Sequence, residues 1–365
     1  MSTNISILCM GDAMPGGVLH YETSCEFCDP DLLTILRQAD IRVATLETAV
    51  GDEPHFDKEK MARDKDVIYC PTKNLYRLKE LGIDVVSLAN NHAWDLGENG
   101  IIQTFKELDK LGIKYCGAGL NLADASKPAV IKVKGKSVAF IAYCDNQPGT
   151  CGYVPEATDT HPGINIMKEN NIRESITKLK DKFDYLFVMM HWGKEYYYYP
   201  TPQVNSLAKK MINWGADGII GSHSHQIQPT IVYHSKPIIF SLGNFFFPDR
   251  FITSPRSTYY PEKKPELNNM PVTHGYPMVD EPTFKIWRPV ARTGQIINIT
   301  LGNGVLKISR ILTCLDKHSH ISVYKGHLPA LFKLSHLLVK IPGYSRLFFG
   351  MRGCRFIKKK IKGEL

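Results

Sequence analysis

The sequence predicts an α/β domain built around a mixed β-sheet, and two observations support this prediction. Short apolar runs alternate along the chain with longer stretches in which apolar residues recur at helical spacing. Polar residues of the kinds that bind metal ions directly follow several of the apolar runs. Alternating strands and helices are typical of α/β domains, whose functional sites form beyond the carboxyl ends of the strands.

The predicted strands are apolar runs bounded by polar or turn-forming residues, as expected of strands buried in a sheet. They are Ile5–Met10, Val43–Leu46, Val85–Ala89, Val138–Tyr143, Tyr185–Met190, Gly218–Gly221 and Ile238–Leu242. Helical spacing predicts helices over Asn74–Leu81, Gly97–Leu111, Asn171–Lys180 and Gln203–Trp214. Further along, Gln295–Leu301 and Val305–Leu312 flank Gly302-Asn303-Gly304, a spacing that predicts a β-hairpin at one edge of the sheet.

The domain organisation follows from the length of the chain and from two segments that break the alternating pattern. A chain of 365 residues suffices for one large domain. The segment from about 248 to 290 is rich in Pro, Tyr and Asn and is longer than an ordinary connection. We therefore predict an irregular insertion there, either a functional loop or a partly disordered one. A main domain is predicted over 1–317 and a basic amphipathic tail over 318–365.

The positive charge of the chain is concentrated in this tail. The net charge is +9, yet the first 316 residues hold 34 basic and 35 acidic residues, whereas the rest holds eleven basic residues and one acid. An almost neutral main domain makes nucleic acid an unexpected partner. The tail mixes apolar residues with Lys and Arg. Such a segment either lies on an anionic membrane surface or packs on the domain with its charged face in solvent.

Cysteine usage and hydropathy indicate the compartment. Nine scattered cysteines, without a recognisable secretion signal, are typical of free thiols in a reducing compartment. Cys25 and Cys28 form a CxxC pair, which is a weak signal for structural zinc because no second pair accompanies it. The sequence contains no run of apolar residues long enough to span a bilayer. We expect a cytoplasmic protein, placed peripherally at the inner membrane face if the tail binds lipid.

Metal-binding side chains follow five of the predicted strands. They are Asp12, Glu47, the run Asn90-Asn91-His92, His191, and the pair His223 and His225. Carboxylates can bridge two cations, imidazole binds transition metals, and oxygen ligands keep Mn²⁺ or Fe²⁺ competitive with Zn²⁺. Two cations about 3.5–4 Å apart can clamp a phosphoryl group and generate a hydroxide nucleophile. Although a helix cap or a turn would explain single residues, their order together predicts one or two divalent cations, Mn, Zn or Fe.

Four stretches of the sequence are distinctive. They are SLANNHAWDLGENGI (Ser87–Ile101), HWGKEY (His191–Tyr196), GADGIIGSHSHQIQP (Gly215–Pro229) and IIFSLGNF (Ile238–Phe245). With the preceding Gly-Asp and Leu-Glu pairs, they resemble the CapA family of poly-γ-glutamate capsule-synthesis proteins, within the calcineurin-like metallophosphoesterase superfamily. The resemblance covers Ile5 to about Phe247. It implies a four-layer α-β-β-α sandwich, the calcineurin-like metallophosphatase fold.

The resemblance also implies roles for the residues that follow the strands. One cation would be held by Asp12, Glu47 and His225. The other would be held by Glu47, Asn91, His191 and His223. His92 would act as the general acid or as a phosphate clamp.

The sequence departs from the superfamily pattern at the first ligands. The usual Asp-x-His is here Asp12-Ala13-Met14, so one histidine ligand is missing. Glu47 stands where the superfamily has a bridging Asp, and Ser224 stands where the family often has Pro. The loss at Met14 leaves a mononuclear centre, or a weakly bound second metal, as alternatives to a full pair.

Further residues complete the predicted site. Glu195 joins His92 and Asn91 as a candidate catalytic residue, with a surface salt bridge as the alternative. The candidates for substrate binding are Asn90, Asn244 and Trp192. Asn244 alternatively satisfies only backbone groups. Asp95 either orients His92 through a hydrogen bond or caps the following helix.

The sequence leaves three functions open. The resemblance implies a metal-dependent hydrolase or transferase acting in capsule or poly-γ-glutamate synthesis. A generic phosphoesterase for a small phosphorylated substrate would need the same ligands. A non-catalytic assembly factor of a membrane-bound polymer synthase is favoured by the loss at Met14, whereas the intact Asn91-His92 and His223-x-His225 favour an enzyme. The expected partners are a polymer or a phosphorylated small molecule, a polymer-synthase complex, and an anionic membrane surface through the tail.

Overall fold

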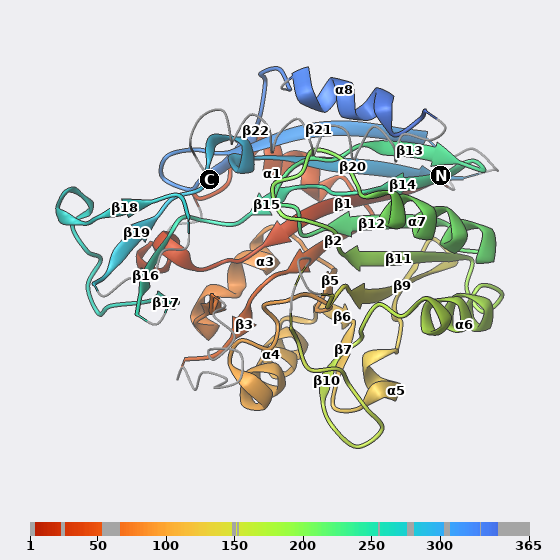
Figure 1. Cartoon of the computed structure of the whole chain (residues 1–365), viewed down its shortest axis with the longest axis horizontal. Coiled ribbons are helices and arrows are strands. Elements are labelled where there is room, and N and C mark those ends of the chain that lie inside the picture. Colours follow the sequence, from red (N-terminus) through yellow and green to blue (C-terminus); the bar gives the residue numbers. More distant parts are fainter. Residues whose placement is uncertain are drawn as a thin grey trace, which may run out of the picture.

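Two β-sheets lie at the centre of the molecule, with helices on the outer side of each (Figure 1). The computed structural model describes residues 4–22, 26–52, 66–147, 151, 153–254, 256–275, 281–302, 307–328 and 330–341. Cys25 of the CxxC pair, residues 303 and 304 of the predicted hairpin turn, and the tail beyond 341 lie outside the described residues. No helix in these described ranges is both long and apolar enough to cross a membrane.

Both sheets are mixed. The eight-stranded sheet has the order β22 (Ile321–Val323), β21 (Lys307–Leu315), β20 (Thr293–Leu301), β1 (Ile5–Ala13), β2 (Ile41–Leu46), β5 (Val85–Ser87) and β6 (Lys114–Cys116), and β15 (Asn244–Phe246) also pairs with β1. The six-stranded sheet has the order β13 (Thr230–Tyr233), β14 (Lys236–Ile239), β12 (Gly218–Ser222), β11 (Tyr185–His191), β9 (Lys136–Cys144) and β8 (Ala129–Val133). The antiparallel pairing of β20 with β21 confirms the predicted hairpin strands.

The helices begin and end at residues that favour those positions. Their bounds are α1 (Pro30–Arg37), α3 (Tyr76–Glu80), α4 (Gly97–Leu111), α5 (Leu122–Ala125), α6 (Glu169–Leu179), α7 (Pro202–Trp214) and α8 (Ala330–Leu338). Helix α7 starts after Thr201, whose side chain accepts a hydrogen bond from the Val204 amide. Helix α4 ends before Gly112, which adopts the left-handed conformation at φ 69°.

The alternation of side chains along β11 separates the two cores of the sandwich. Leu186, Val188 and Met190 pack with apolar residues of α6 and α7. Phe187 and Met189 point to the other face, into the core shared with the eight-stranded sheet and with α1, α3 and α4. Because successive side chains of a strand point to opposite faces, one strand serves both cores. These layers form a four-layer α-β-β-α sandwich, which confirms the fold expected from the resemblance.

The chain crosses from one sheet to the other at Leu242. The strand predicted over Ile238–Leu242 instead ends at Ile239. The Leu242 amide then donates to the Gly221 carbonyl in β12, and its carbonyl accepts from the Gln295 amide in β20. A Cβ at Gly11 would lie 1.8 Å from the Gly243 carbonyl oxygen, so only glycine permits this close approach to β1. The crossing places β15 beside the end of β1.

The segment from about 248 to 290, predicted to be irregular, contains a small four-stranded sheet. Its order is β17 (Ser257–Tyr259), β16 (Arg250–Thr253), β19 (Thr283–Lys285) and β18 (Val272–Thr273). Strands of two to four residues are too short to show a periodic pattern in the sequence, which is why the prediction missed them. At the other predicted boundary, β22 pairs with β21, so the eight-stranded sheet continues beyond residue 317.

The remaining short elements connect the layers. They are β3 (Ala49–Val50) paired with β4 (Tyr69–Cys70), β7 (Ala118–Gly119) paired with β10 (Gly163–Ile164), and the 3-10 turns η1 (Gly17–Tyr21), η2 (Thr72–Asn74), η3 (Leu267–Asn269) and η4 (Pro289–Arg292).

Candidate metal centre

Most of the side chains predicted to bind metal meet at the carboxyl ends of strands from both sheets. Asp12 lies in the last residues of β1, and Glu47 directly follows β2. His191 ends β11, and His223 and His225 follow β12. All five residues are buried. The two sheets therefore contribute to one cluster, as the positions of these residues in the sequence predict.

One group of potential ligands consists of Asp12, Glu47 and His225. One ligand atom from each lies within 4.8 Å of the others. His225 Nδ1 is 3.7 Å from Asp12 Oδ2, and His225 Nε2 is 3.7 Å from Glu47 Oε1. The ring of His225 is oriented by Asn244, whose Oδ1 lies 2.9 Å from Nδ1.

A second group surrounds His191. Its Nε2 is 2.7 Å from Asn91 Oδ1 and 3.1 Å from His223 Nδ1. Cys151 joins His191 and His223 within the same 4.8 Å limit. Glu47 Oε1 lies 3.4 Å from His191 Nε2, so this carboxylate contacts both groups. Glu47 therefore lies between the two groups of potential ligands, and its bridging of two cations stays a prediction.

The turn that carries His223 and His225 has an unusual backbone. Their φ values are 88° and 50°, in the left-handed region that residues other than glycine seldom adopt. The His223 amide donates to Asp12 Oδ2 at 3.2 Å, which ties the turn to β1. Such strain persists where surrounding contacts fix the backbone, and it is common at functional sites.

The electrostatics of the cluster fit a bound cation. Burial, followed by the charge of Glu47, raises the pKa of Asp12 well above its usual value. Burial lowers the pKa of His191 to about 3, so its imidazole is neutral and able to bind metal at physiological pH. Asp12 Oδ1 is buried and accepts no hydrogen bond from the described residues. A divalent cation would supply the positive charge that two buried carboxylates need.

His92, the residue after the potential ligand Asn91, is held by a third carboxylate, that of Asp95. Its Nδ1 lies 2.7 Å from Asp95 Oδ2, which also accepts from the Ile68 amide at 2.5 Å. Of the two roles considered for Asp95, the structure favours orientation of His92. Glu195 lies close enough for its charge to raise the pKa of Asp12 further, after burial and Glu47.

The three residues predicted to bind substrate, Trp192, Asn90 and Asn244, form hydrogen bonds with other groups of the protein. The indole of Trp192 packs in the core beneath α6 and α7 and donates to the Phe240 carbonyl at 3.0 Å. The prediction for Trp192 is therefore corrected, because its side chain points away from His191.

The side-chain amide of Asn90 donates to the Leu46 carbonyl and accepts from the His92 backbone amide. Asn244 is buried, bonds the His225 ring and donates to the Ala291 carbonyl, so it satisfies a backbone group and also a side chain of the cluster.

Met14 lies in an apolar cluster where the superfamily has a histidine ligand. It packs with Ile68, Phe247, Trp287 and Ala291. The Trp287 ring centroid is 4.8 Å from that of His225. The side of the centre next to His225 is therefore closed by apolar and aromatic groups.

The small sheet brings basic residues close to this side of the centre. Lys285 Nζ and Arg250 Cζ each lie 5.5 Å from the centroid of Trp287. Burial lowers the pKa of Lys285 well below its usual value, and the nearby charge of Arg250 adds to this effect. Residues of the small sheet thus lie against one wall of the site, and the sequence did not indicate which residues these would be.

Sequence reasoning missed two residues that contact His191. Ser222 Oγ lies 2.8 Å from His191 Nδ1 and also accepts from Thr45 Oγ1 at 3.1 Å. Its position at the end of β12, opposite His191 in the register, is the signal that would have found it. Cys151 follows β9 by several residues in a segment without periodicity, so nothing in the sequence pointed to it.

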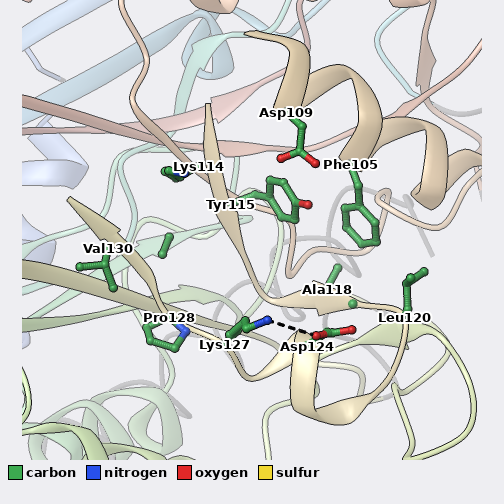
Figure 2. A pocket seen from close by; sticks show the side chains of 12 residues that line it. Phe105, Asp109, Lys114, Tyr115, Ala118, Leu120, Asp124, Lys127, Pro128 and Val130 are labelled. Carbon is green, nitrogen blue, oxygen red and sulfur yellow. Dashed lines mark hydrogen bonds and ion pairs between the residues drawn. The ribbon is translucent and has the colours of Figure 1, made fainter. Parts of the chain in front are cut away.

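A separate pocket of about 490 Å³ lies between the edge strands β6 and β8 and helices α4 and α5. Figure 2 shows the side chains that line it. The rings of Phe105 and Tyr115 stack in it with centroids 5.0 Å apart, and Lys127 pairs with Asp124 at its rim. None of the potential metal ligands lines this pocket, so it is distinct from the centre.

A family model described as "Bacterial capsule synthesis protein PGA_cap" matches residues 6–249, a range that includes all the potential ligands above. The chain belongs to this family. The resemblance to CapA proteins stated from the sequence is thereby confirmed.

Several curated relatives are similar to this chain over about half of their length. The chain is 35% identical over 206 residues to the capsule biosynthesis protein CapA of Bacillus anthracis, covering 53% of this chain and 49% of the relative. It is 32% identical over 215 residues to the PGA biosynthesis protein CapA of Bacillus subtilis, covering 58% and 54%. A probable polyglutamine synthesis accessory protein of Mycobacterium tuberculosis is 28% identical over 216 residues, covering 56% and 55%. The chain thus spans about half the length of these curated relatives.

Proposed function

We propose that this chain is a metal-dependent hydrolase or transferase that acts in the synthesis of a bacterial capsule polymer, with poly-γ-glutamate as the substrate class. Membership of the PGA_cap family and the names of the two Bacillus relatives support the biosynthetic role. The metal-dependent chemistry is supported by the position of Glu47. Its Oε1 lies 3.4 Å from His191 Nε2 and 3.7 Å from His225 Nε2, between the two ligand groups.

The chain's own residues have distinct proposed roles. Asp12, Glu47 and His225 would hold one cation, and Glu47, Asn91, His191 and His223 the other. A bound cation supplies Lewis-acid chemistry and lowers the pKa of bound water. His92, oriented by Asp95, would donate a proton to the leaving group, and Glu195 would face the substrate at the entrance.

Metal content and turnover together test the proposal. Protein purified without chelator should contain Mn, Zn or Fe at fewer than two ions per chain, because Met14 replaces one ligand. It should also cleave poly-γ-glutamate or a chromogenic phosphodiester, and His223→Ala should lose both the metal and the activity. A chain that is metal-free and refuses added Mn²⁺ and Zn²⁺ would contradict the proposal. Cleavage of the phosphodiester but not of the polymer would favour a generic phosphoesterase.

A second candidate function is a non-catalytic assembly factor of a polymer synthase. The apolar packing of Met14 favours it, because one side of the centre has lost a ligand. Complementation of a capsule-deficient strain distinguishes the two candidates. A His223→Ala chain that restores normal polymer production would establish the assembly role, whereas failure with wild-type expression would favour the enzyme.

A further inference from the structure

Cys151 lies at the second ligand group, although neither its position in the sequence nor the CapA resemblance points to it. Its side chain is 2% exposed. Its Sγ and one ring nitrogen each of His191 and His223 all lie within 4.8 Å of one another. A thiol and two imidazoles at this separation are a combination that holds transition metals in proteins.

The chain brings Cys151 to this place through the loop that follows β9. Strands β9 and β11 are parallel neighbours, and Cys144 at the end of β9 is in register with His191. The Asp145 amide then donates to the His191 carbonyl at 2.9 Å, and the Cys151 thiol donates to the same carbonyl at 3.4 Å. Asp145 and Cys151 are therefore both bonded to the residue whose imidazole belongs to the centre.

We propose that Cys151 is a thiolate ligand of the cation held by His191 and His223. The inference rests on the metal centre of the proposed function. As the sulfur–metal bond forms, the thiol proton leaves to solvent and the hydrogen bond to the His191 carbonyl is given up. The two halves of the centre then differ in chemistry, with Cys151, His191 and His223 on one side and Asp12, Glu47 and His225 on the other.

This difference determines which metal each half prefers. Thiolate is a soft ligand that selects Zn²⁺ over Mn²⁺, whereas carboxylates suit the harder Mn²⁺. The half that contains Cys151 should therefore take Zn²⁺ first. The half that lacks a histidine at Met14 should bind more weakly and accept Mn²⁺.

Cobalt titration of the full chain, after removal of metal by a chelator, tests the assignment. Co²⁺ bound to thiolate gives an intense near-ultraviolet charge-transfer band that oxygen and nitrogen ligands do not produce. We expect the band in the wild-type chain and in the control Cys144→Ser, and its absence in Cys151→Ser. Zn²⁺ binding to Cys151→Ser should weaken at least about tenfold, since even loss of an outer partner of a ligand costs that much.

The outcomes separate this inference from the proposed function. Co²⁺ that binds without the sulfur band, or a band that persists in Cys151→Ser, would overturn the role of Cys151 and leave the centre intact. Failure of the wild-type chain to bind Co²⁺ would overturn both. A Cys144–Cys151 disulfide in the metal-loaded protein would also refute the assignment of Cys151 as a ligand.

A measurement on the wild-type chain tests the assignment even if Cys151→Ser fails to fold. X-ray absorption of the zinc-loaded wild type should show a Zn–S distance of about 2.3 Å beside the shorter Zn–N and Zn–O distances. A shell of nitrogen and oxygen alone would exclude the thiolate.

Discussion

Asn244 Oδ1 lies 2.9 Å from His225 Nδ1, while Asn244 Nδ2 donates to the Ala291 carbonyl at 2.9 Å. The amide therefore fixes the ring of His225 with its Nε2 towards Glu47. Asn244 begins β15, the strand that the chain reaches after it crosses between the sheets. A side chain expected to contact substrate thus positions a candidate metal ligand.

We expect Asn244→Ala to weaken metal binding by about 10–100-fold, the usual loss when the partner of a ligating histidine is removed. The fold should remain, because the deletion is small and leaves the ligands in place. Calorimetric titration with Mn²⁺ measures the affinity. Asn205→Ala, which also truncates a buried asparagine but in α7, is the matched control and should bind metal normally. Equal affinities in the two variants would show that Asn244 does not orient His225.

His92→Asn should lower kcat by about 10²–10⁴-fold and leave the metal content near the wild-type level. The reason is that the proposed role of His92, which Asp95 orients, is to donate a proton and not to hold a cation. Elemental analysis and steady-state kinetics on the same preparations check both parts. Loss of metal in His92→Asn would instead place this side chain among the ligands.

Asp12→Asn should make the metal-free protein more stable at neutral pH while abolishing stabilisation by metal. The pKa of Asp12 is raised above 3.8 in the folded chain, first by burial and then by Glu47. Below pH 3.8, Asp12 is protonated in both the folded and the unfolded chain and does not destabilise the fold. As pH rises through the folded pKa, the buried carboxylate ionises and the free energy of unfolding falls. The advantage of the variant should therefore grow from acidic to neutral pH, and thermal unfolding with chelator and with Mn²⁺ measures it.

The control for this prediction is Asp184→Asn. The Lys136 ammonium, which donates a hydrogen bond to Asp184, lowers the pKa of this exposed carboxyl, so the sign is opposite. That variant should gain no stability at neutral pH and should keep the metal response. A metal-dependent rise in Tm that survives in Asp12→Asn would remove Asp12 from the ligand set.

We expect the full chain to co-sediment with anionic liposomes and a chain truncated after His318 to lose this binding. Each Lys or Arg near an anionic surface contributes on the order of 1 kcal/mol, and salt screens that attraction. Binding should therefore weaken as ionic strength rises. Because β22 and α8 also follow His318, a second truncation after Ile341 keeps them and isolates the basic end. Equal sedimentation with neutral lipid would refute a membrane role.

The convergence of the candidate ligands could be predicted because it depends on local rules. Strand ends are visible in the sequence as the end of an apolar run, and the carboxyl ends of parallel strands share one edge. The same alternation rule places Trp192, the neighbour of His191, on the opposite face, and applying it would have prevented that error. Cys151 could not be found in this way, because its approach to His191 depends on the path of a loop.

The small sheet was missed for a different reason. Its strands, such as Arg250–Thr253, are too short to establish a pattern, and their pairing joins residues far apart in the sequence. The burial of Lys285 and Arg250 beside Trp287 is a product of that pairing. Non-local contacts of this kind leave no periodic trace in the residues themselves.

The crossing at Leu242 and the ligand groups lie along the same seam between the two sheets. Asp12 lies in a strand of the eight-stranded sheet and Glu47 follows another, whereas His191 ends a strand of the six-stranded sheet and His223 follows another. A cation bound among them would act as a cross-link, joining two halves that are otherwise held at this end by hydrogen bonds such as that from Thr45 to Ser222. Loss of the ion would then loosen the sandwich from its functional end first, so that metal starvation would appear in the cell as reduced resistance of the chain to proteolysis.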